Sequence, residues 1–457
     1  MKVAESLADV VALDEDEFWE SRPELRTIRD FARARLTAPW STFGYVLARA
    51  VAVIPPTVVL PPIVGSVASL NTFVAVVGPS GSGKGASDGV ARDLLQTTPR
   101  VHTVKPGSGE GIPKEYAWIN TPRGKTPIQH PLRNSVLFNV SEIDTLANLG
   151  RRSGSTLMPE LRAAWSGEEL GFAYSDQTKK LRIEPHRFRM CLVTGVQPGQ
   201  AGALFEETSG GTPQRFLWMP TNDLNRPRSL PDEPPPLDLP EWPGRGVLVT
   251  EPDDDGVERE DLGLLKLHLP VERIEWHTLD VPQAVRDAIH QDRSAGLDRS
   301  IAGAADVDPL EGHWFLVRLK IAAGLMWLNG RRDGVTDEDW ELAGVVKAVS
   351  DRTRAEAQEV LAKNARQESI QRGRAAGHRS VAAREVTEED DIKRAAQRIT
   401  GYLERKGGTA TRSLIRKDGL RPDIKPLIDD ALARLVDAGT VTVTEGDHGR
   451  VEVSLCR

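Results

Sequence analysis

The chain has 457 residues, which is enough for two to four domains with a sizeable buried core. Its composition, with 39% hydrophobic and 27% charged residues, is that of an ordinary soluble globular protein. The formal net charge is −7, so the protein is not a polycation, and any surface that binds nucleic acid must be local.

The sequence also argues against a membrane protein and against a disulfide-rich protein. The longest apolar stretch, residues 46–70, is interrupted by four prolines and does not begin as a signal peptide does, so we expect a cytoplasmic protein with no membrane partner. The two cysteines, Cys191 and Cys456, form neither a disulfide framework nor a metal-ligand spacing. The nine histidines show no paired motif, and we expect no structural metal.

The N-terminal region is expected to be helical from residue 13 to residue 52. Apolar residues recur there at spacings near three and four, at Phe18, Trp19, Leu25, Ile28, Phe31 and Leu36. We interpret Trp19 and Trp40 as packing residues rather than as a stacking platform. A short strand bounded by prolines is predicted at residues 57–60.

The chain is organised around residues 74–85. A β-branched apolar run leads into the pattern G-x-x-x-x-G-K, from Gly78 to Lys84, and a helix is predicted over residues 86–96. Glycines let successive backbone N–H groups point at an anion, the helix N-terminus adds partial positive charge, and the lysine can neutralise β- and γ-phosphates. We therefore expect an ATP-binding loop, rather than an incidental turn, formed by Gly78, Ser80, Gly81, Ser82, Gly83, Lys84, Gly85 and Ala86.

One position departs from that pattern. The hydroxyl residue that usually follows the lysine and holds Mg²⁺ is replaced by Gly85, and the nearest downstream hydroxyl, Ser87, faces another way around the helix. Mg²⁺ is then held through water, held weakly, or not held at all. Ser87 and Asp144, which follows a later strand, are the candidate metal ligands.

Two further loops follow predicted strands. A short alternating run at residues 101–104 precedes a glycine-rich loop at 106–112, which either approaches the nucleotide or a central channel or forms a plain turn. A buried strand at 135–140 is followed by Glu142 and Asp144. We expect Glu142 to act as the base on the attacking water and Asp144 to support the metal, although the two could exchange roles or simply cap the next helix.

A third buried strand, residues 189–198, ends in polar side chains. Gln197, or failing that Thr194, is expected to sense the γ-phosphate. Arg215 lies between a flexible loop and an apolar run, where it could reach a phosphate, including the nucleotide of a neighbouring subunit.

A helix containing Leu157 and Leu161, followed by a hairpin over residues 172–183, is predicted before that strand. The basic tip of the hairpin carries Lys179 and Lys180. This tip either reaches DNA or is a solvated charged turn.

Prolines at residues 225–243 mark a stiff connector. Beyond it, residues 310–328 form a strongly apolar helix in which Arg318 or Lys320 either faces the nucleotide from a lid domain or is a snorkelling surface cation. A helix start is clear at residues 336–339. Residues 352–384, rich in arginine and alanine, are either a solvated helix or a disordered linker, with enough positive charge to touch phosphate.

The C-terminal residues have another pattern. Three helices, at 391–405, 412–417 and 422–439, precede two strand-like runs around a turn, which is the arrangement of a winged helix. A basic cluster lies before and at the start of the third helix, the end that would enter a DNA groove: Arg412, Arg416, Lys417, Arg421 and Lys425. A protein-binding winged helix is the alternative, because acidic residues are also frequent here.

From about residue 40 to residue 354, the chain resembles the AAA+-like P-loop helicase ATPases of phages, plasmids and integrated mobile elements, which are often fused to or encoded beside a primase-polymerase. The resemblance rests on motifs at residues 78–84, 107–111, 141–144, 195–198, 213–216, 318–320 and 339–343. It implies ATP hydrolysis with Mg²⁺ at the subunit interfaces of a ring, expected to be a hexamer, with a primase-polymerase as a candidate partner. No primase-polymerase module is visible in this chain.

The resemblance also implies roles for individual residues. Lys84 would bind the phosphates, Glu142 would be the base, Gln197 the sensor, and Arg215 a finger acting in trans. This chain departs from the family at two positions, because Gly85 replaces the metal hydroxyl and Ser141 stands where an acidic residue commonly precedes the glutamate.

The sequence therefore predicts an α/β protein with a P-loop NTPase (AAA+-like) parallel-sheet core. The expected parts are an N-terminal helical region (1–56), the ATPase core (57–224), a Pro-rich connector (225–245), a helical lid or C-terminal part of the ATPase module (246–350), a basic linker (351–387) and a winged-helix domain (388–457).

Two main functions are consistent with these features. The first is an ATP-dependent helicase or replication-initiator ATPase of a phage or mobile element, acting as a ring on single- or double-stranded DNA. The second is a nucleotide-switched DNA-binding or assembly protein with weak or no hydrolysis. Gly85 and Ser141 favour the second function, whereas Glu142 and Arg215 favour the first. A weaker third function is an ATPase that remodels protein partners.

Overall fold

The computed structural model describes residues 15–121, 127–150, 155–172, 174–176, 180–206, 211–242, 276–301, 313–446 and 450–456. The chain divides into two compact units, residues 1–363 and 364–457. Each unit has its own hydrophobic core, and no residue belongs to both cores. Among the described helices, none combines the length and the apolar character needed to cross a membrane.

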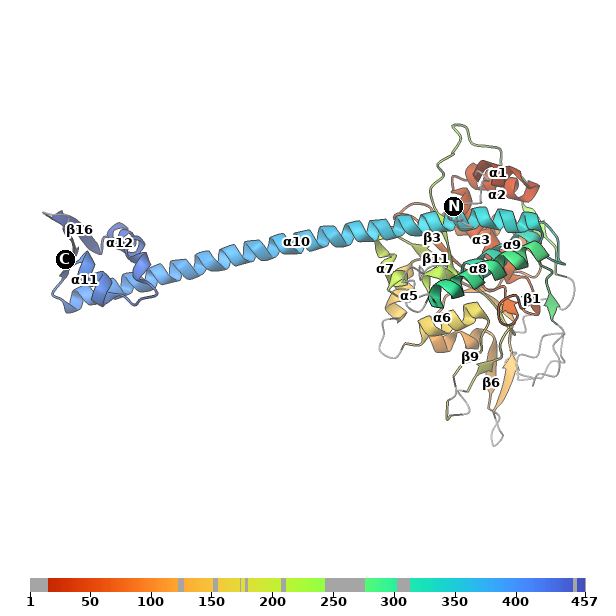
Figure 1. Cartoon of the computed structure of the whole chain (residues 1–457), viewed down its shortest axis with the longest axis horizontal. Helices are drawn as coiled ribbons and strands as arrows, with labels where there is room; N and C mark the ends of the chain where they lie inside the picture. The colour runs from red at the N-terminus through yellow and green to blue at the C-terminus, as the bar shows by residue number, and fades with distance from the viewer. Residues whose placement is uncertain are drawn as a thin grey trace. The chain divides into compact units, whose positions relative to one another are not determined.

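A five-stranded parallel sheet forms the centre of the first unit (Figure 1). In spatial order its strands are β12 (Phe216–Pro220), β3 (Thr72–Val77), β11 (Arg189–Val196), β8 (Ser135–Val140) and β5 (Thr103–Val104). Every residue of β3, β11 and β12 is buried, as unbroken apolar runs predict for parallel strands covered on both faces. The α/β class and the buried strands expected around residues 74–77, 135–140 and 189–198 are thus confirmed.

Three N-terminal helices, α1 (Glu15–Glu20), α2 (Pro23–Ala34) and α3 (Pro39–Ala52), confirm the expected helical region. α3 is buried along its whole length because it lies against β3, β11 and β12 and also contacts α9 (Trp314–Leu328). Phe18, Trp19, Trp40 and Phe43 form an aromatic cluster in which the Trp19 and Trp40 ring centroids are 4.6 Å apart. Both tryptophans are packing residues, as predicted.

Shorter elements surround the sheet. The other α-helices among the described residues before 302 are α4 (Lys84–Leu94), α5 (Ile143–Gly150), α6 (Leu157–Ser166), α7 (Gly202–Phe205) and α8 (Gln283–Ile301). Small antiparallel pairs join β6 (Ala117–Asn120) to β7 (Ile128–Pro131) and β9 (Leu170–Gly171) to β10 (Arg182–Ile183). A further small sheet contains β14 (His277–Thr278), β1 (Val58–Leu60) and β2 (Ala68–Ser69).

The proline-rich segment expected to be a stiff connector packs onto the first unit instead. Its strand β13 (Leu237–Leu239) pairs in parallel with β4 (Leu95–Thr97), and Leu239 and Trp242 are buried. Helix α9, from the region expected to be a helical lid or the C-terminal part of the ATPase module, belongs to the same hydrophobic core as the sheet. Apolar contacts between residues distant in sequence hold both segments on the first unit.

The helix start expected at residues 336–339 is confirmed by α10 (Asp337–Arg405), whose residues belong to both units. Residues 352–384 are helical, which settles the choice between a helix and a disordered linker. The second unit contains the end of α10, α11 (Arg412–Leu414), the π-helical turn η8 (Ile415–Gly419) and α12 (Ile428–Asp437). Its antiparallel sheet has the order β15 (Thr409–Thr411), β17 (Arg450–Leu455) and β16 (Val441–Gly446). The expected hairpin and three helical segments are present, although the third helix begins at Ile428 rather than near residue 422.

Candidate functional site

The carboxyl ends of the parallel strands meet at one edge of the sheet, where α/β proteins place their ligands. β3 leads into the loop of residues 78–84, and α4 begins at Lys84. Gly81 and Gly83 have φ angles of 77° and 85°, which favour glycine over residues with a Cβ. The Gly78 N–H donates to the Val196 carbonyl at 3.0 Å, which anchors the start of the loop on β11.

The side chain of Lys84 folds back onto the backbone of the 78–84 loop. The side chain is only 7% exposed, and Nζ donates to the carbonyl oxygens of Gly78 at 2.9 Å and Pro79 at 2.8 Å. These acceptors are neutral, so the ammonium charge has no counter-ion among its hydrogen-bond partners. Phosphate oxygens could replace the two carbonyls, and the loop and lysine therefore fit the phosphates of a nucleotide.

Gly195 brings the lysine close to the turn that carries Glu142. A Cβ built on Gly195 would lie 2.2 Å from the Ser141 carbonyl oxygen and 3.5 Å from Cδ of Lys84. Only a residue without a side chain allows this approach between β11 and the end of β8. Gln197, two residues later, donates through Nε2 to Oε2 of Glu142 at 3.5 Å. Lys84, Glu142 and Gln197, predicted from three separate motifs, therefore gather at one edge.

The two candidate metal ligands are placed differently. Ser87 is 1% exposed, and its hydroxyl lies 2.7 Å from Oγ of Ser41 and 3.2 Å from the Gly83 carbonyl oxygen. The burial of this hydroxyl against α3 argues against Ser87 as a Mg²⁺ ligand. Asp144 is exposed in the first turn of α5. Among the described residues, no group of three or more His, Cys, Asp and Glu side chains is arranged to hold a metal ion.

Arg215 lies at the opposite edge of the sheet. The next residue, Phe216, pairs with Phe73, five residues before Gly78, which is about 16 Å along a strand. Nη1 of Arg215 donates to the Gly211 carbonyl at 2.6 Å, and Cζ lies 5.4 Å from the Trp165 ring centroid. Burial lowers the pKa of Arg215 below its usual range. The distance along the sheet excludes the 78–84 loop of the same chain as the target of Arg215.

Arg318 and Lys320 are interior packing residues, which neither sequence alternative foresaw. Arg318 donates from Nε to the Trp340 carbonyl at 2.9 Å and lies 4.0 Å above the Trp340 ring, and burial lowers its pKa to about 10. Lys320 is 2% exposed and donates to the carbonyls of Asn71 and Trp165, both at 2.8 Å. The expected contact between Arg318 and the nucleotide is not supported by these partners.

A cavity beside the 78–84 loop was missed by the sequence analysis. It has a volume of about 180 Å³ and is lined by Val77, Gly78, Pro79, Pro198, Pro220, Thr221, Asn222, Thr353, Glu356, Ala357 and Val360. Thr221 donates from Oγ1 to Oγ of Ser82 at 2.9 Å, which ties β12 to the loop. The polar pair at residues 221–222, directly after a buried strand, was the signal that could have identified this wall.

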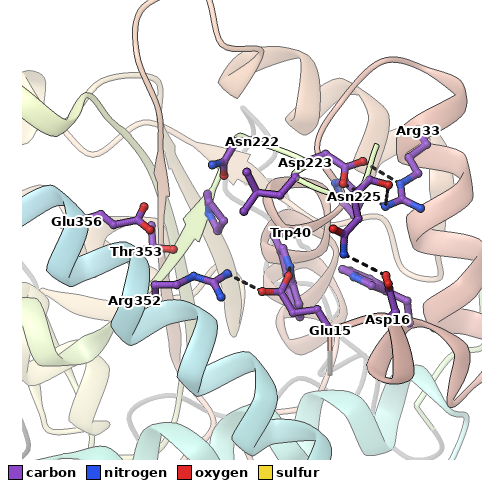
Figure 2. A pocket seen from close by; sticks show the side chains of 14 residues that line it. Glu15, Asp16, Arg33, Trp40, Asn222, Asp223, Asn225, Arg352, Thr353 and Glu356 are labelled. Carbon is purple, nitrogen blue, oxygen red and sulfur yellow. Dashed lines mark hydrogen bonds and ion pairs between the residues drawn. The ribbon is translucent and has the colours of Figure 1, made fainter. Parts of the chain in front are cut away.

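A second cavity of about 120 Å³ adjoins the first, because both are lined by Pro220, Asn222, Thr353 and Glu356. Figure 2 shows Arg352 of α10 reaching Glu15 of α1 across this second cavity, at 2.6 Å. The Trp40 indole N–H donates to the same carboxylate at 2.6 Å. The N-terminal helices and α10 thus complete a partly apolar hollow that extends away from the 78–84 loop.

Of the two candidate DNA-binding lysines, Lys179 lies outside the described residues, and Lys180 is exposed just before β10. Beside the paired strands β9 and β10 is a cavity of about 560 Å³ with aromatic walls from Trp118, Phe172 and Tyr174.

The basic cluster of the second unit is partly neutralised. Arg412 forms a bidentate pair with Asp429 of α12, at 2.8 and 2.6 Å, and Nζ of Lys425 donates to the Lys417 carbonyl at 3.2 Å. Arg416, Lys417 and Arg421 are exposed. Besides the paired Asp429, α12 exposes Asp430, Arg434 and Asp437, so its exposed face carries charges of both signs.

No protein-family model matches the chain, and a search of curated proteins finds no match either.

Proposed function

We propose that this chain is a ring-forming ATPase of the AAA+-like P-loop class that acts on DNA, as a helicase or replication initiator of a phage or other mobile element, and that its second unit is a winged helix. The observation that carries the proposal is the convergence of Lys84, Glu142 and Gln197 at the carboxyl edge of three adjacent strands. A cationic phosphate site beside a carboxylate is what hydrolysis of a phosphoanhydride by water requires.

Each of these residues has a role in the proposed reaction. The backbone amides of the 78–84 loop and Lys84 bind the β- and γ-phosphates, with Lys84 exchanging its two carbonyl partners for phosphate oxygens. Glu142 orients the attacking water and accepts its proton. Gln197 holds the Glu142 carboxylate and faces the γ-phosphate. The cavity beside the loop takes the adenosine end of ATP.

The residues around the 78–84 loop suit the phosphates of ATP better than they suit a Mg²⁺ ion. When bound, Mg²⁺ neutralises charge on the phosphates. Of the two expected ligands, Asp144 is exposed, whereas the Ser87 hydroxyl is buried and bonded to protein oxygens.

The proposal is tested by the rate of ATP hydrolysis with and without single-stranded DNA. We expect DNA to stimulate hydrolysis, Lys84→Ala to abolish both binding and turnover, and Glu142→Gln to abolish turnover while ATP still binds. ATP binding is followed separately with a fluorescent nucleotide. Turnover that Glu142→Gln leaves unchanged would contradict the assigned base.

The role of Arg215 in trans has its own test. Arg215→Ala and Lys84→Ala are expected to be inactive alone and to recover part of the activity when mixed, because some interfaces then combine an intact lysine with an intact arginine. Arg162→Ala, which removes a neighbouring cation bonded to Thr212, is the matched control and should retain turnover. Mixing without recovery would count against a shared site.

A nucleotide switch with weak or no hydrolysis is the second candidate. The observation that favours it is the incomplete metal site, with Gly85 after the lysine and Ser87 engaged by Ser41. In that case ATP would bind through Lys84 and change the affinity for DNA, while turnover would stay at background under every condition.

A further inference from the structure

Besides the cluster at residues 412–425, the second unit has a concentration of positive charge on helix α10. Residues 364–387 contain five arginines, no lysine and two glutamates, in a chain whose net charge is −7. Residues 388–457 contain thirteen Lys and Arg against thirteen Asp and Glu, so the remainder of the unit is neutral. Every residue of α10 from 362 to 390 is exposed. This segment is therefore a local basic surface of the kind that binds phosphate.

Three of the arginines share one face of α10 with two aliphatic side chains. The spacings are four, four, three, four and three residues through Arg366, Ile370, Arg374, Gly377, Val381 and Arg384, which we call the basic face. Such spacings keep residues on one side of a helix. The face extends for about 27 Å at 1.5 Å per residue, and it ends at Glu388. Arg372 and Arg379 lie on the opposite side.

The basic face has no partner within the part of the chain that the structure describes. Arg366, Arg374 and Arg384 form no hydrogen bond or ion pair there, whereas Arg372 lies 3.8 Å from Glu368. Ile370 and Val381 are 48% and 56% exposed, so they add apolar contact area to this face. Arginines without acidic partners on an exposed helix can accept an external anionic ligand.

The segment also has little intrinsic stability as a helix. Gly373 and Gly377 each cost about 1 kcal/mol relative to alanine in a helix interior. Helices gain most of their stability from tertiary contacts, which this segment lacks among the described residues. A ligand that engages the basic face should therefore also increase the helicity of the segment.

We propose that the basic face of α10 binds the phosphate backbone of nucleic acid. Arginine suits this partner because its planar guanidinium pairs with phosphate in a bidentate manner. The 27 Å face matches about eight base pairs of duplex at 3.4 Å each. Gly377 leaves room for close approach of the backbone, and Ile370 and Val381 can pack against sugars. Two aliphatic side chains without aromatic residues are a poor anchor for a membrane surface.

The proposal deepens the DNA-binding part of the proposed function and is independent of hydrolysis. The test uses the full chain carrying Lys84→Ala, without nucleotide, and measures the fluorescence anisotropy of a labelled single strand and a labelled duplex of equal length. Arg374→Gln/Arg384→Gln removes two charges from the basic face. Arg372→Gln/Arg379→Gln removes the same charge from the opposite side of the same helix and is the matched control.

We expect the basic-face double variant to weaken DNA binding about tenfold and to lower the slope of log affinity against log salt by about 2 for the duplex. The control pair should change affinity less than twofold. Circular dichroism should show a gain of helix when DNA is added to the parent protein and a smaller gain for the basic-face variant. Equal thermal melting of both doubles shows that folding is intact.

Several results would overturn the proposal. An equal loss in both doubles would mean general electrostatic attraction rather than a binding face, and no loss in either would place the DNA contact elsewhere. Binding to phosphatidylserine vesicles through the same arginines, with no DNA binding, would assign the face to a membrane surface. If the protein binds DNA through the basic face but does not hydrolyse ATP, the proposed ATPase activity is refuted and the DNA-binding proposal is not.

Discussion

At the scale of single residues, Glu160 shows how burial sets the charge of a side chain. It lies on α6, is 6% exposed, and accepts a hydrogen bond from the Gly171 N–H at 2.8 Å. Loss of solvation raises the pKa of Glu160 to about 7, and the charges of Glu110 and Glu169 act in the same direction. The folded state therefore binds this proton more tightly than the unfolded state.

This pKa predicts a pH-dependent stability. Because the unfolded carboxyl has a pKa of 4.5, the stability that Glu160 contributes is present below that pH and is lost as the pH rises to about 7. Glu160→Gln should raise the melting temperature relative to the parent at pH 8, and the difference should vanish near pH 4. Thermal melting across this range measures it. A lower melting temperature for Glu160→Gln at pH 8 would contradict the argument.

At the scale of elements, the start of α10 is fixed by a buried carboxylate. Asp339 is fully buried, accepts from the Thr336 N–H at 2.8 Å and lies 2.9 Å from Nη2 of Arg22 on α2. The Asp339 N–H in turn donates to Oγ1 of Thr336 at 3.2 Å, which makes a reciprocal cap. Arg331 also pairs with Asp339, so one side chain joins three segments of the first unit.

Removal of the Asp339 carboxylate should lower the free energy of unfolding more than removal of the Thr336 hydroxyl does. Asp339→Ala removes the ion-pair partner of Arg331 and one of the two carboxylates that pair with Arg22, which keeps Glu338, and is expected to lower the free energy of unfolding by about 3 kcal/mol. Thr336→Ala removes only the hydroxyl and should cost about 1 kcal/mol. Urea unfolding followed by tryptophan fluorescence compares the two variants. Equal costs would mean that the arginines find other partners.

At the scale of the whole molecule, two separate cores are joined by one helix. The first core includes the sheet, the N-terminal helices and α9, and the second is built from residues after 391. Between them, residues 362–390 of α10 make no buried contact. Regions with few buried contacts open locally at low free energy.

Limited proteolysis should reflect this division. Trypsin is expected to cut first at the exposed arginines between residues 366 and 384 and to leave two resistant fragments, because each retains its own core. Mass spectrometry identifies the cut sites. DNA should slow this cleavage if the basic face binds phosphate. A first cut within the parallel sheet would contradict the division.

The local elements were largely accessible from the sequence. The buried strands ending before Gly78, Ser141 and Gln197 were legible because parallel strands covered on both faces need unbroken apolar runs. Glycine spacing and the lysine identified the 78–84 loop, and the cap at Thr336 marked a helix start. Each of these signals lies within about ten residues of chain, where backbone geometry and burial periodicity act directly.

Contacts between distant segments were decided only by the tertiary structure. The order of the strands placed β11 between β3 and β8, so that Gln197 meets Glu142 and Gly195 adjoins Lys84. Packing also turned Ser87 toward Ser41 and brought α10 beside the 78–84 loop. The same local sequence patterns would be present if the strands were arranged in another order. The sequence by itself thus determined which segments carry the chemistry, and long-range packing decided which of them meet.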